Sequence, residues 1–196
     1  MTEGDGGGSV YESLAESVRR LIDVTIRTEV DAHRVATAKA HIDRAIDQLS
    51  DALIPGSFGI RETIDEQPAA AGNVAIGVRN PVAPPLAIHR DANGAVWTEI
   101  TLGAAYEGPP GHVHGGVCAL ILDHVLGSTA HQPGRPAYTG TLTLRYERGT
   151  PLGPLRVDAH VERIDGTKTF AKGRIADSQG VTVTAEGVFI FPRDTS

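Results

Sequence analysis

The chain has 196 residues, a formal net charge of −6 and 40% hydrophobic residues, which fits one folded domain with an appendage. The acidic balance and the lack of a basic cluster argue against a nucleic-acid partner. The only cysteine, Cys118, rules out an intrachain disulfide and favours a cytoplasmic location. We see no signal peptide at the N-terminus, and no apolar run is long enough to span a membrane.

Residues 1–55 are predicted to form a tail and a helical extension. Residues 1–9 are rich in glycine, and we expect them to be disordered. Between Val10 and Leu53 apolar residues recur at spacings of three and four, which predicts one long or two shorter amphipathic helices. These helices are expected to pack on the main domain or on a partner chain. Residues 56–79 are rich in Gly, Ala and Pro, and we interpret them as a connector.

Residues 80–196 are predicted to form one α+β domain. Leu86–His89 and Val96–Leu102 are expected to pair as a hairpin around the turn Asp91–Gly94. After a helix, four more strands are predicted between turns: Tyr138–Glu147, Leu155–Asp165, Thr167–Asp177 and Val181–Phe191. This order predicts an antiparallel sheet around a buried central helix, with the last four strands arranged as a meander.

The segment from Gly108 to His131 carries the residues with the clearest chemistry. A Gly-Pro-Pro-Gly turn leads into His-Val-His-Gly-Gly and then into an apolar run that leaves no polar stripe, which predicts a helix buried on all sides. Asp123 lies in the middle of this run. Burying an unpaired carboxylate is costly, so an acid at this position needs a partner or a function.

Gly115 and Gly116 at the start of this helix are expected to present free N–H groups, and the helix dipole favours negative charge there. Such donors can stabilise an oxyanion, while Asp123 can act as a base that apolar surroundings strengthen. The structural alternatives are close helix–sheet packing for the two glycines and a hydrogen bond to Ser or Thr for the acid.

The histidines and the cysteine admit other interpretations. His112, His114 and Asp123-His124 suggest a di-metal site, but nine residues separate His114 from Asp123, so the contiguous spacing of such sites is missing and we predict no metal. His114 is instead expected to fix the loop by hydrogen bonds, and we include it with Asp123, Gly116 and Thr139 among the predicted catalytic residues. Cys118 is expected to be a core residue rather than a nucleophile.

The domain resembles the hotdog-fold acyl-CoA thioesterases, in the branch that includes the phenylacetate-pathway enzymes. The resemblance is carried by His114-Gly115-Gly116 and by Asp123 nine residues after the histidine. Three flanking segments are also similar: Asn80–Leu86, Tyr106–Gly111 and Tyr146–Leu152. The similar region covers roughly residues 80–192 and leaves the N-terminal helices outside it.

The resemblance implies a sheet wrapped around a central helix, and hydrolysis of acyl-CoA thioesters to free acid and CoA. Asp123 would act as general base or nucleophile, with Thr139 assisting it. N–H groups near Gly115 and Gly116 would hold the thioester carbonyl. No cofactor is implied, because CoA is part of the substrate. Several relatives carry Asn or Gln six residues before the histidine, where this chain has Gly108.

The resemblance also implies dimers whose sheets join, or dimers of dimers. Helix geometry supports sharing of the site between two chains, because Gly116 and Asp123 are about 10.5 Å apart along one helix at roughly 1.5 Å per residue. One thioester carbonyl is not expected to reach both groups within one chain. An antiparallel helix across a two-fold axis would bring Asp123 of one chain beside Gly116 of the other.

Three arginines lie in or beside the turn after the strand that begins near Thr139, and guanidinium groups are suited to the phosphates of CoA. Of Arg145, Arg148 and Arg156, we take Arg145 and Arg148 as substrate-binding residues. The alternative is that they only keep the surface hydrophilic. Two rival functions remain for the whole domain: a non-catalytic protein that binds acyl groups or acyl-CoA, and a hotdog dehydratase.

Overall fold

The computed structural model describes residues 10–59, 61–62, 68–131 and 137–192. The expected disorder of residues 1–9 lies outside these ranges. The chain divides into two compact units, Met1–Asn73 with Gly77–Pro81, and Val74–Ile76 with Val82–Ser196. Within the described ranges, no helix combines the length and the apolar character needed to cross a membrane.

The first unit contains two separate helices, α1 (Val10–Arg27) and α2 (Ala32–Ser50), which confirms the shorter-helix form of the prediction. Asp31 begins α2, because its carboxylate accepts a hydrogen bond from the Arg34 N–H at 3.0 Å. Two short strands, β1 (Arg61–Glu62) and β2 (Pro68–Ala69), pair in the connector.

Helix α1 holds the segment 77–81 through two side chains, Arg19 and Tyr11. The Arg19 guanidinium donates to the carbonyl oxygens of Val78 and Asn80, both at 3.2 Å. The Arg79 guanidinium lies 3.6 Å from the centre of the Tyr11 ring. The end of the predicted connector is therefore bound to the first helix.

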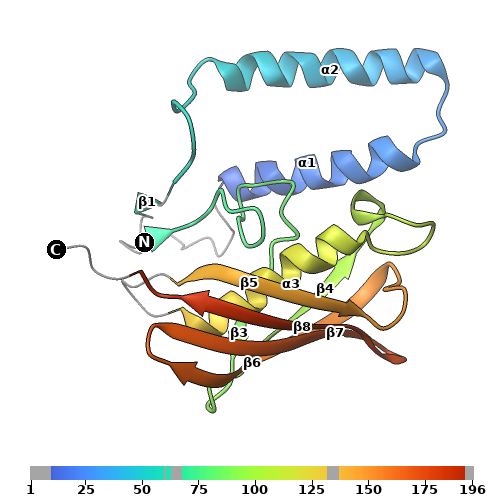
Figure 1. Ribbon diagram of the computed structural model, residues 1–196. Coiled ribbons are helices and arrows are strands. Elements are labelled where there is room, and N and C mark those ends of the chain that lie inside the picture. The colour runs from blue at the N-terminus through green and yellow to red at the C-terminus, as the bar shows by residue number, and fades with distance from the viewer. Residues whose placement is uncertain (1–9, 60, 63–67, 132–136, 193–196) are drawn as a thin grey trace, which may run out of the picture. The chain divides into compact units, whose positions relative to one another are not determined.

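The second unit is a six-stranded antiparallel sheet around one helix. Its strands are β3 (His89–Arg90), β4 (Val96–Leu102), β5 (Tyr138–Tyr146), β6 (Gly153–Asp165), β7 (Lys168–Asp177) and β8 (Gly180–Ile190). They lie in the order β3-β4-β6-β7-β8-β5 (Figure 1). The predicted four-strand meander is therefore wrong in one respect, because β5 pairs with β8 at the sheet edge and not with β6. Alternation of apolar residues predicts which side of a strand is buried but not which strand lies beside it.

The predicted first hairpin forms, but β3 is only two residues long and starts later than expected. Its turn closes with the Gly94 N–H donating to the Asp91 carbonyl at 2.9 Å. Leu86, predicted to be in the strand, is buried, and its N–H donates to the Ala75 carbonyl at 3.0 Å. The proline-rich segment that ends at Leu86 is therefore a loop, and Leu86 packs against the core.

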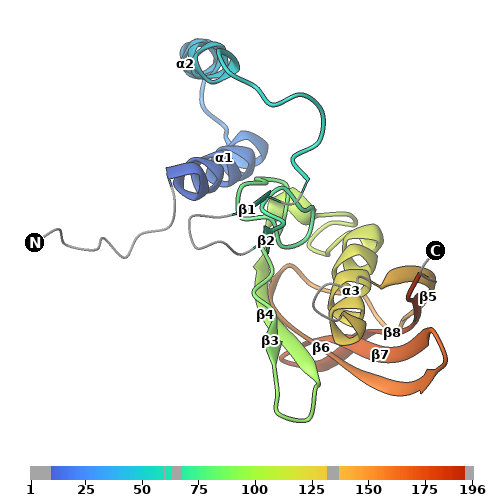
Figure 2. The ribbon, with the colours of Figure 1, turned by 90° about the vertical axis from the view of Figure 1, so that its left-hand side faces the viewer.

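Helix α3 (Gly115–Ala130) lies against the face of the sheet that forms the core, as Figures 1 and 2 show. Its apolar residues reach the sheet closely because small residues line the facing strands. A Cβ atom at Gly173 would lie 2.5 Å from Cδ1 of Leu126, and one at Gly187 would lie 3.1 Å from Cδ2 of the same residue. Glycine is needed at Gly173 for the helix to fit against the sheet.

The core of the second unit contains no residue from α1 or α2, since its buried members run from Ala75 to Phe189. We therefore expect a chain that begins at residue 54 to fold. Its thermal midpoint should fall by no more than about 2–4 °C, which corresponds to about 1 kcal/mol in a domain of about this length. Circular dichroism melting and gel filtration test this, and an aggregated product would show that the helices complete the core.

Candidate active site

The loop before α3 contains a hydrogen-bonded turn that precedes and positions His114. The His112 N–H donates to the Pro109 carbonyl at 2.8 Å, and Gly111 takes a φ of 73° at the third position, as in a type II turn with proline second. After the turn, the His114 N–H donates to the Tyr106 carbonyl at 2.9 Å. The sequence therefore presents the His-Gly-Gly motif from a loop that is fixed at both ends.

His114 caps α3 with its own ring. Its Nδ1 accepts the Gly116 N–H at 3.0 Å, so the predicted role of His114 in fixing the loop is confirmed. The expectation that both glycine N–H groups are free is wrong for Gly116. The next two N–H groups, of Val117 and Cys118, both donate to the His114 carbonyl. Among the described residues, none accepts a hydrogen bond from the Gly115 N–H, which makes it the available donor at this helix start.

Tyr146 fixes the first residue of α3 from strand β5. Its hydroxyl donates to the Gly115 carbonyl at 2.8 Å, and a Cβ atom at Gly115 would lie 3.3 Å from that hydroxyl oxygen. Tyr146 begins one of the segments that resemble the family, but neither that likeness nor its place in a predicted strand indicates a contact with α3.

The departure at Gly108 has a local cause. A Cβ atom there would lie 2.7 Å from the Cα of His114, which is a backbone atom and cannot turn aside. The Asn or Gln expected from the resemblance therefore has no room in this loop. Gly108 allows the loop to lie close to His114, and the chain therefore has no side chain at position 108 that could orient the substrate.

Asp123 lies on the side of α3 that the sheet does not cover. The sheet buries Cys118, Ile121, Leu122, Val125 and Leu126, whereas Asp123 is half-buried. The prediction of a helix buried on all sides is therefore wrong within one chain. The Thr139 hydroxyl donates to Oδ1 of Asp123 at 2.8 Å, which brings together two of the predicted site residues. No described residue donates to Oδ2, so the second carboxylate oxygen is available.

A bulge in β5 turns Thr139 toward Asp123. The register with β8 shifts between Thr139 and Thr141, so Gly140 is an extra residue without a partner on β8. Strict alternation would place Thr139 on the same face as Thr141. The extra residue places it with Leu142, which packs against the core. A glycine inside a strand was the one sequence signal of this bulge.

The other candidates of the segment have structural partners. Cys118 is buried, its Sγ lies 3.8 Å from the Thr150 hydroxyl, and burial raises the pKa of its thiol, so it is a core residue as predicted. Burial also lowers the pKa of His124 and favours its neutral form. Among the described residues, no three His, Cys, Asp or Glu side chains are grouped closely enough to hold a metal ion.

Arg148 and Arg156 are already paired within the sheet. The Arg148 guanidinium binds both carboxylate oxygens of Asp177 and also donates to the Gly180 carbonyl at 2.9 Å. This pairing lowers the pKa of the Asp177 carboxyl and raises that of Arg148. Arg156 pairs with Asp158 at 3.0 Å. A role for Arg148 in substrate binding stays a prediction, and it would require this arginine to leave or share Asp177.

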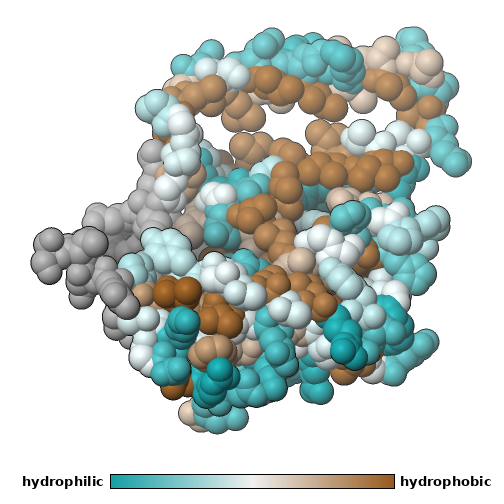
Figure 3. Space-filling model, viewed as in Figure 1, coloured by the Kyte–Doolittle hydropathy of each residue, from teal (hydrophilic) through white to brown (hydrophobic). Residues whose placement is uncertain are grey.

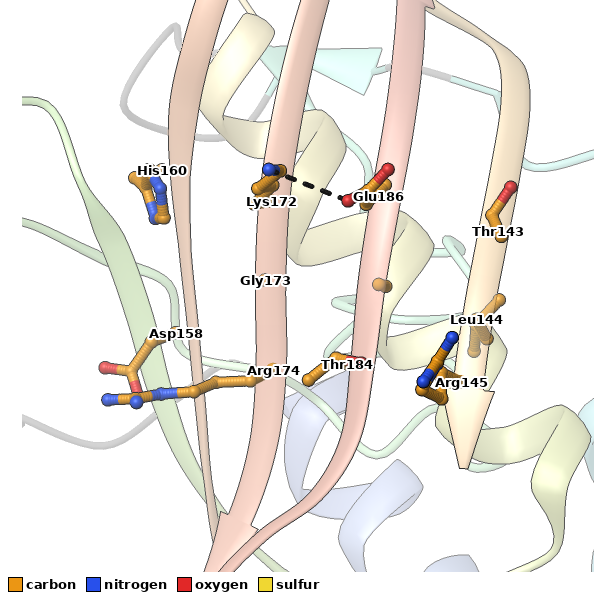
Figure 4. A pocket seen from close by; sticks show the side chains of 11 residues that line it. Thr143, Leu144, Arg145, Asp158, His160, Lys172, Gly173, Arg174, Thr184 and Glu186 are labelled. Carbon is orange, nitrogen blue, oxygen red and sulfur yellow. Dashed lines mark ion pairs between the residues drawn. The ribbon is translucent and has the colours of Figure 1, made fainter. Parts of the chain in front are cut away.

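Arg145 lies on the opposite face of the sheet from α3, where it lines a groove of about 720 Å³ (Figure 4). In one row across the strands, Arg145 is opposite Thr184, which is opposite Arg174, which is opposite Asp158. Figure 4 shows α3 behind the strands. The structure therefore does not bring Arg145 to Asp123 within one chain, and its role as a substrate residue stays a prediction.

Removing the Thr139 hydroxyl should weaken the site without unfolding it. Thr139→Val keeps a β-branched side chain but leaves Oδ1 of Asp123 without its donor. Hydrogen bonds to charged groups are worth about 1.5–3 kcal/mol, so we expect about a tenfold or greater fall in kcat of the hydrolysis that the family resemblance implies. Thr139→Ser should retain most of the rate, and equal losses in the two variants would show that the hydroxyl is not the cause.

The fold and the site together define one class of protein, a sheet wrapped around a helix that carries a hydroxyl-bound carboxylate and whose first N–H has no acceptor in the described part of the chain. A family model of the thioesterase superfamily matches residues 110–184. The crystal structure of protein RHA08564, a thioesterase superfamily protein, is 33% identical, covers 97% of this chain and 94% of its own, and superposes with a TM-score of 0.79. The chain belongs to the thioesterase superfamily, and its architecture is the hotdog fold.

Curated relatives match over part of their length. Mouse acyl-coenzyme A thioesterase THEM5 is 33% identical over 91 residues, which are 45% of this chain and 37% of that protein. Xenopus laevis acyl-coenzyme A thioesterase THEM4 is 33% identical over 90 residues, which are 45% of this chain and 40% of that protein. The matched region is thus less than half of each of these relatives.

Proposed function

We propose that the protein hydrolyses acyl-CoA thioesters to a free acid and CoA. The observation that carries the proposal is the 2.8 Å hydrogen bond from Thr139 to Asp123, on a helix whose first N–H has no acceptor among the described residues. The fold is that of the thioesterase superfamily, and the two curated relatives named above are acyl-CoA thioesterases. A carboxylate near an oxyanion donor is what thioester hydrolysis requires.

The reaction needs one attacking oxygen and one place for negative charge. Thr139 holds one oxygen of Asp123, and the free oxygen accepts the proton of a water molecule or itself attacks the thioester carbon. The carbonyl oxygen becomes negative and is stabilised by the Gly115 N–H at the positive end of α3. When Asp123 acts as a base, the hydroxyl of the water bonds to the carbon, the carbon–sulfur bond breaks, and the CoA thiolate takes the proton that Asp123 accepted from the water. When Asp123 itself attacks, the carbon–sulfur bond breaks to leave an anhydride between Asp123 and the acyl group, and a water molecule hydrolyses it, which releases the free acid and supplies the proton of CoA.

Each complete site is proposed to combine two chains of a homodimer or of a dimer of dimers. Gly115 and Asp123 are eight residues apart, or about 12 Å along the helix at roughly 1.5 Å per residue. The side of α3 that carries Asp123 also carries Gly116, which has no side chain, and Ala119, which has a small one, so there is room for a second helix. Edge strand β5 has one neighbour and is largely exposed, with Tyr138 62% exposed, so a second sheet can join there.

The substrate supplies the CoA, and the proposed reaction uses no other cofactor. Arg145 and Arg148 remain the proposed ligands of its phosphates. The cytoplasm is the proposed location, since the single cysteine is buried and free.

A panel of acyl-CoA thioesters, with release of free thiol as the readout, tests the function. Steady turnover of at least one chain length supports hydrolysis. Tight binding of acyl-CoA without thiol release would favour the rival function, a non-catalytic binding protein. Neither binding nor release across the panel would contradict both.

A further inference from the structure

Helix α2 carries an apolar stripe that its own chain leaves uncovered. No side chain of α2 is buried. The stripe consists of Val35, Ala38, Ile42, Ala45, Ile46 and Leu49. Val35, Ile46 and Leu49 are 48%, 55% and 52% exposed, and Figure 3 shows a hydrophobic band along one edge of the helix. Most of the stability of a protein helix comes from packing of its apolar face, so we expect this band to pack on a partner surface.

The spacing of the stripe is that of a helix that packs on another helix. Val35, Ile42 and Leu49 follow each other at intervals of seven, and Ala38 and Ala45 lie between them at the same interval. Apolar residues at two positions of a seven-residue repeat form the seam of a two-helix pair. Alanine at one of the two positions allows the helix axes to approach closely.

Apart from the capping carboxylate of Asp31, which pairs with Arg34 at 3.6 Å, the charges of α2 are arranged against its own dipole. The first turn contains no acid and includes Arg34, while the last turn contains no base, and Asp47 and Asp51 lie near its end. A lone helix is stabilised by the reverse arrangement. Lys39 pairs with Asp43 along the helix at 2.6 Å, whereas Asp47 and Asp51 have no basic partner among the described residues. An adjacent helix of opposite direction would place a basic end beside this acidic one.

Helix α1 of the same chain does not supply that complement. The loop between α1 and α2 is four residues long, so a packed pair would run antiparallel. The basic end of α1, with Arg27, would then lie near Arg34, and its acidic start, with Glu12 and Glu16, would lie near Asp47. Like charges would meet at both ends. An antiparallel second copy of α2 places opposite charges together at both ends instead.

We infer that α2 is an interaction surface for a second copy of this chain, with the two α2 helices packed antiparallel through the stripe. The two-fold axis passes near Ile42 and Ala45. The helix dipoles then oppose each other, and the basic first half of each helix lies along the acidic second half of the other. This contact is independent of the proposed hydrolysis and of pairing through α3 and β5.

A double cysteine variant of the full chain tests the geometry. In Ala38→Cys/Leu49→Cys, the two thiols of one helix are about 16 Å apart at roughly 1.5 Å per residue, so they cannot join within a chain. The only native cysteine is buried. Mild oxidation should give a linked dimer in which peptide mapping finds position 38 joined to position 49. Links of 38 to 38 would show a parallel pair, and no linked dimer would show no α2 pair; either result overturns the inference.

A matched pair of substitutions tests the stripe. Ala45→Glu places a charge in the seam, and Ala40→Glu makes the same change on the opposite side of the same helix. Burying the unpaired charge should weaken the α2-dependent association about tenfold or more, as measured by sedimentation over a range of concentrations. Ala40→Glu should associate like the natural chain. Equal behaviour of the two variants would contradict the stripe as an interface.

Discussion

Replacing Asp123 with Asn is expected to leave the protein folded and to lower kcat for acyl-CoA hydrolysis by about 10²–10⁴-fold. The Asn side chain has nearly the same shape, and its carbonyl oxygen can still accept the Thr139 hydrogen bond. It cannot accept a proton from water or attack the thioester as a carboxylate does. The measurement is thiol release under saturating substrate, with circular dichroism as the check on folding.

The same substitution at a remote aspartate provides the control. Asp165 is exposed at the end of β6, and Asp165→Asn should hydrolyse the substrate at the natural rate. Near-natural activity in a folded Asp123→Asn protein would remove Asp123 from the chemistry. The Thr139 hydrogen bond would then be a structural contact only.

Replacing Gly115 with Pro is expected to lower kcat by about 10²–10³-fold, the usual loss when one oxyanion donor is removed. Gly115 is the first residue of α3, where proline fits a helix well, and the preceding His114 has the extended backbone that proline requires. The substitution removes one N–H and retains the helix. Gly115→Ala keeps the N–H and controls for the added carbon, which would lie 3.3 Å from the Tyr146 hydroxyl oxygen.

Mixing two inactive chains should restore activity if each site is shared. Asp123→Ala lacks the carboxylate, and Gly115→Pro lacks the donor. In a mixed dimer, one site receives Asp123 from the second variant and the Gly115 N–H from the first, so about half of the natural activity per dimer should return. The chains can be exchanged by unfolding and refolding them together. Confirmed mixed dimers without activity above either parent would contradict the shared site.

The sequence predicted the elements of the sheet well, because local signals mark them. The strands were predicted from the alternation of apolar residues, and the turns from their glycines. Gly166 and Gly180 both have positive φ, as the turns after β6 and β7 require. The position of β5 was not predictable in the same way. Its pairing with β8 depends on how the chain returns across the sheet end, which no local pattern records.

The motif predicted where the site lies, but its contacts are tertiary. His114 and Asp123 were found from their spacing, and the bond to Thr139 was among the structural alternatives for the acid. The capping of Gly116 by the ring of His114 was not foreseen, since a rotamer decides it. Tyr146 was missed because its partner, the Gly115 carbonyl, is 31 residues away in sequence.

Both contacts that orient the site come from one strand. Strand β5 holds α3 at its first residue through Tyr146 and again two turns later through Thr139. Because two hydrogen bonds about two turns apart join α3 to the same strand, we expect them to resist sliding and rotation of the helix relative to β5. The Asp123 carboxylate and the Gly115 N–H then keep their positions relative to the sheet. Strand β5 is itself at the edge of the sheet, where β8 is its neighbour among the described strands. We therefore expect a partner that covers the free edge of β5 to stabilise both contacts together, and the proposed hydrolysis to depend on assembly.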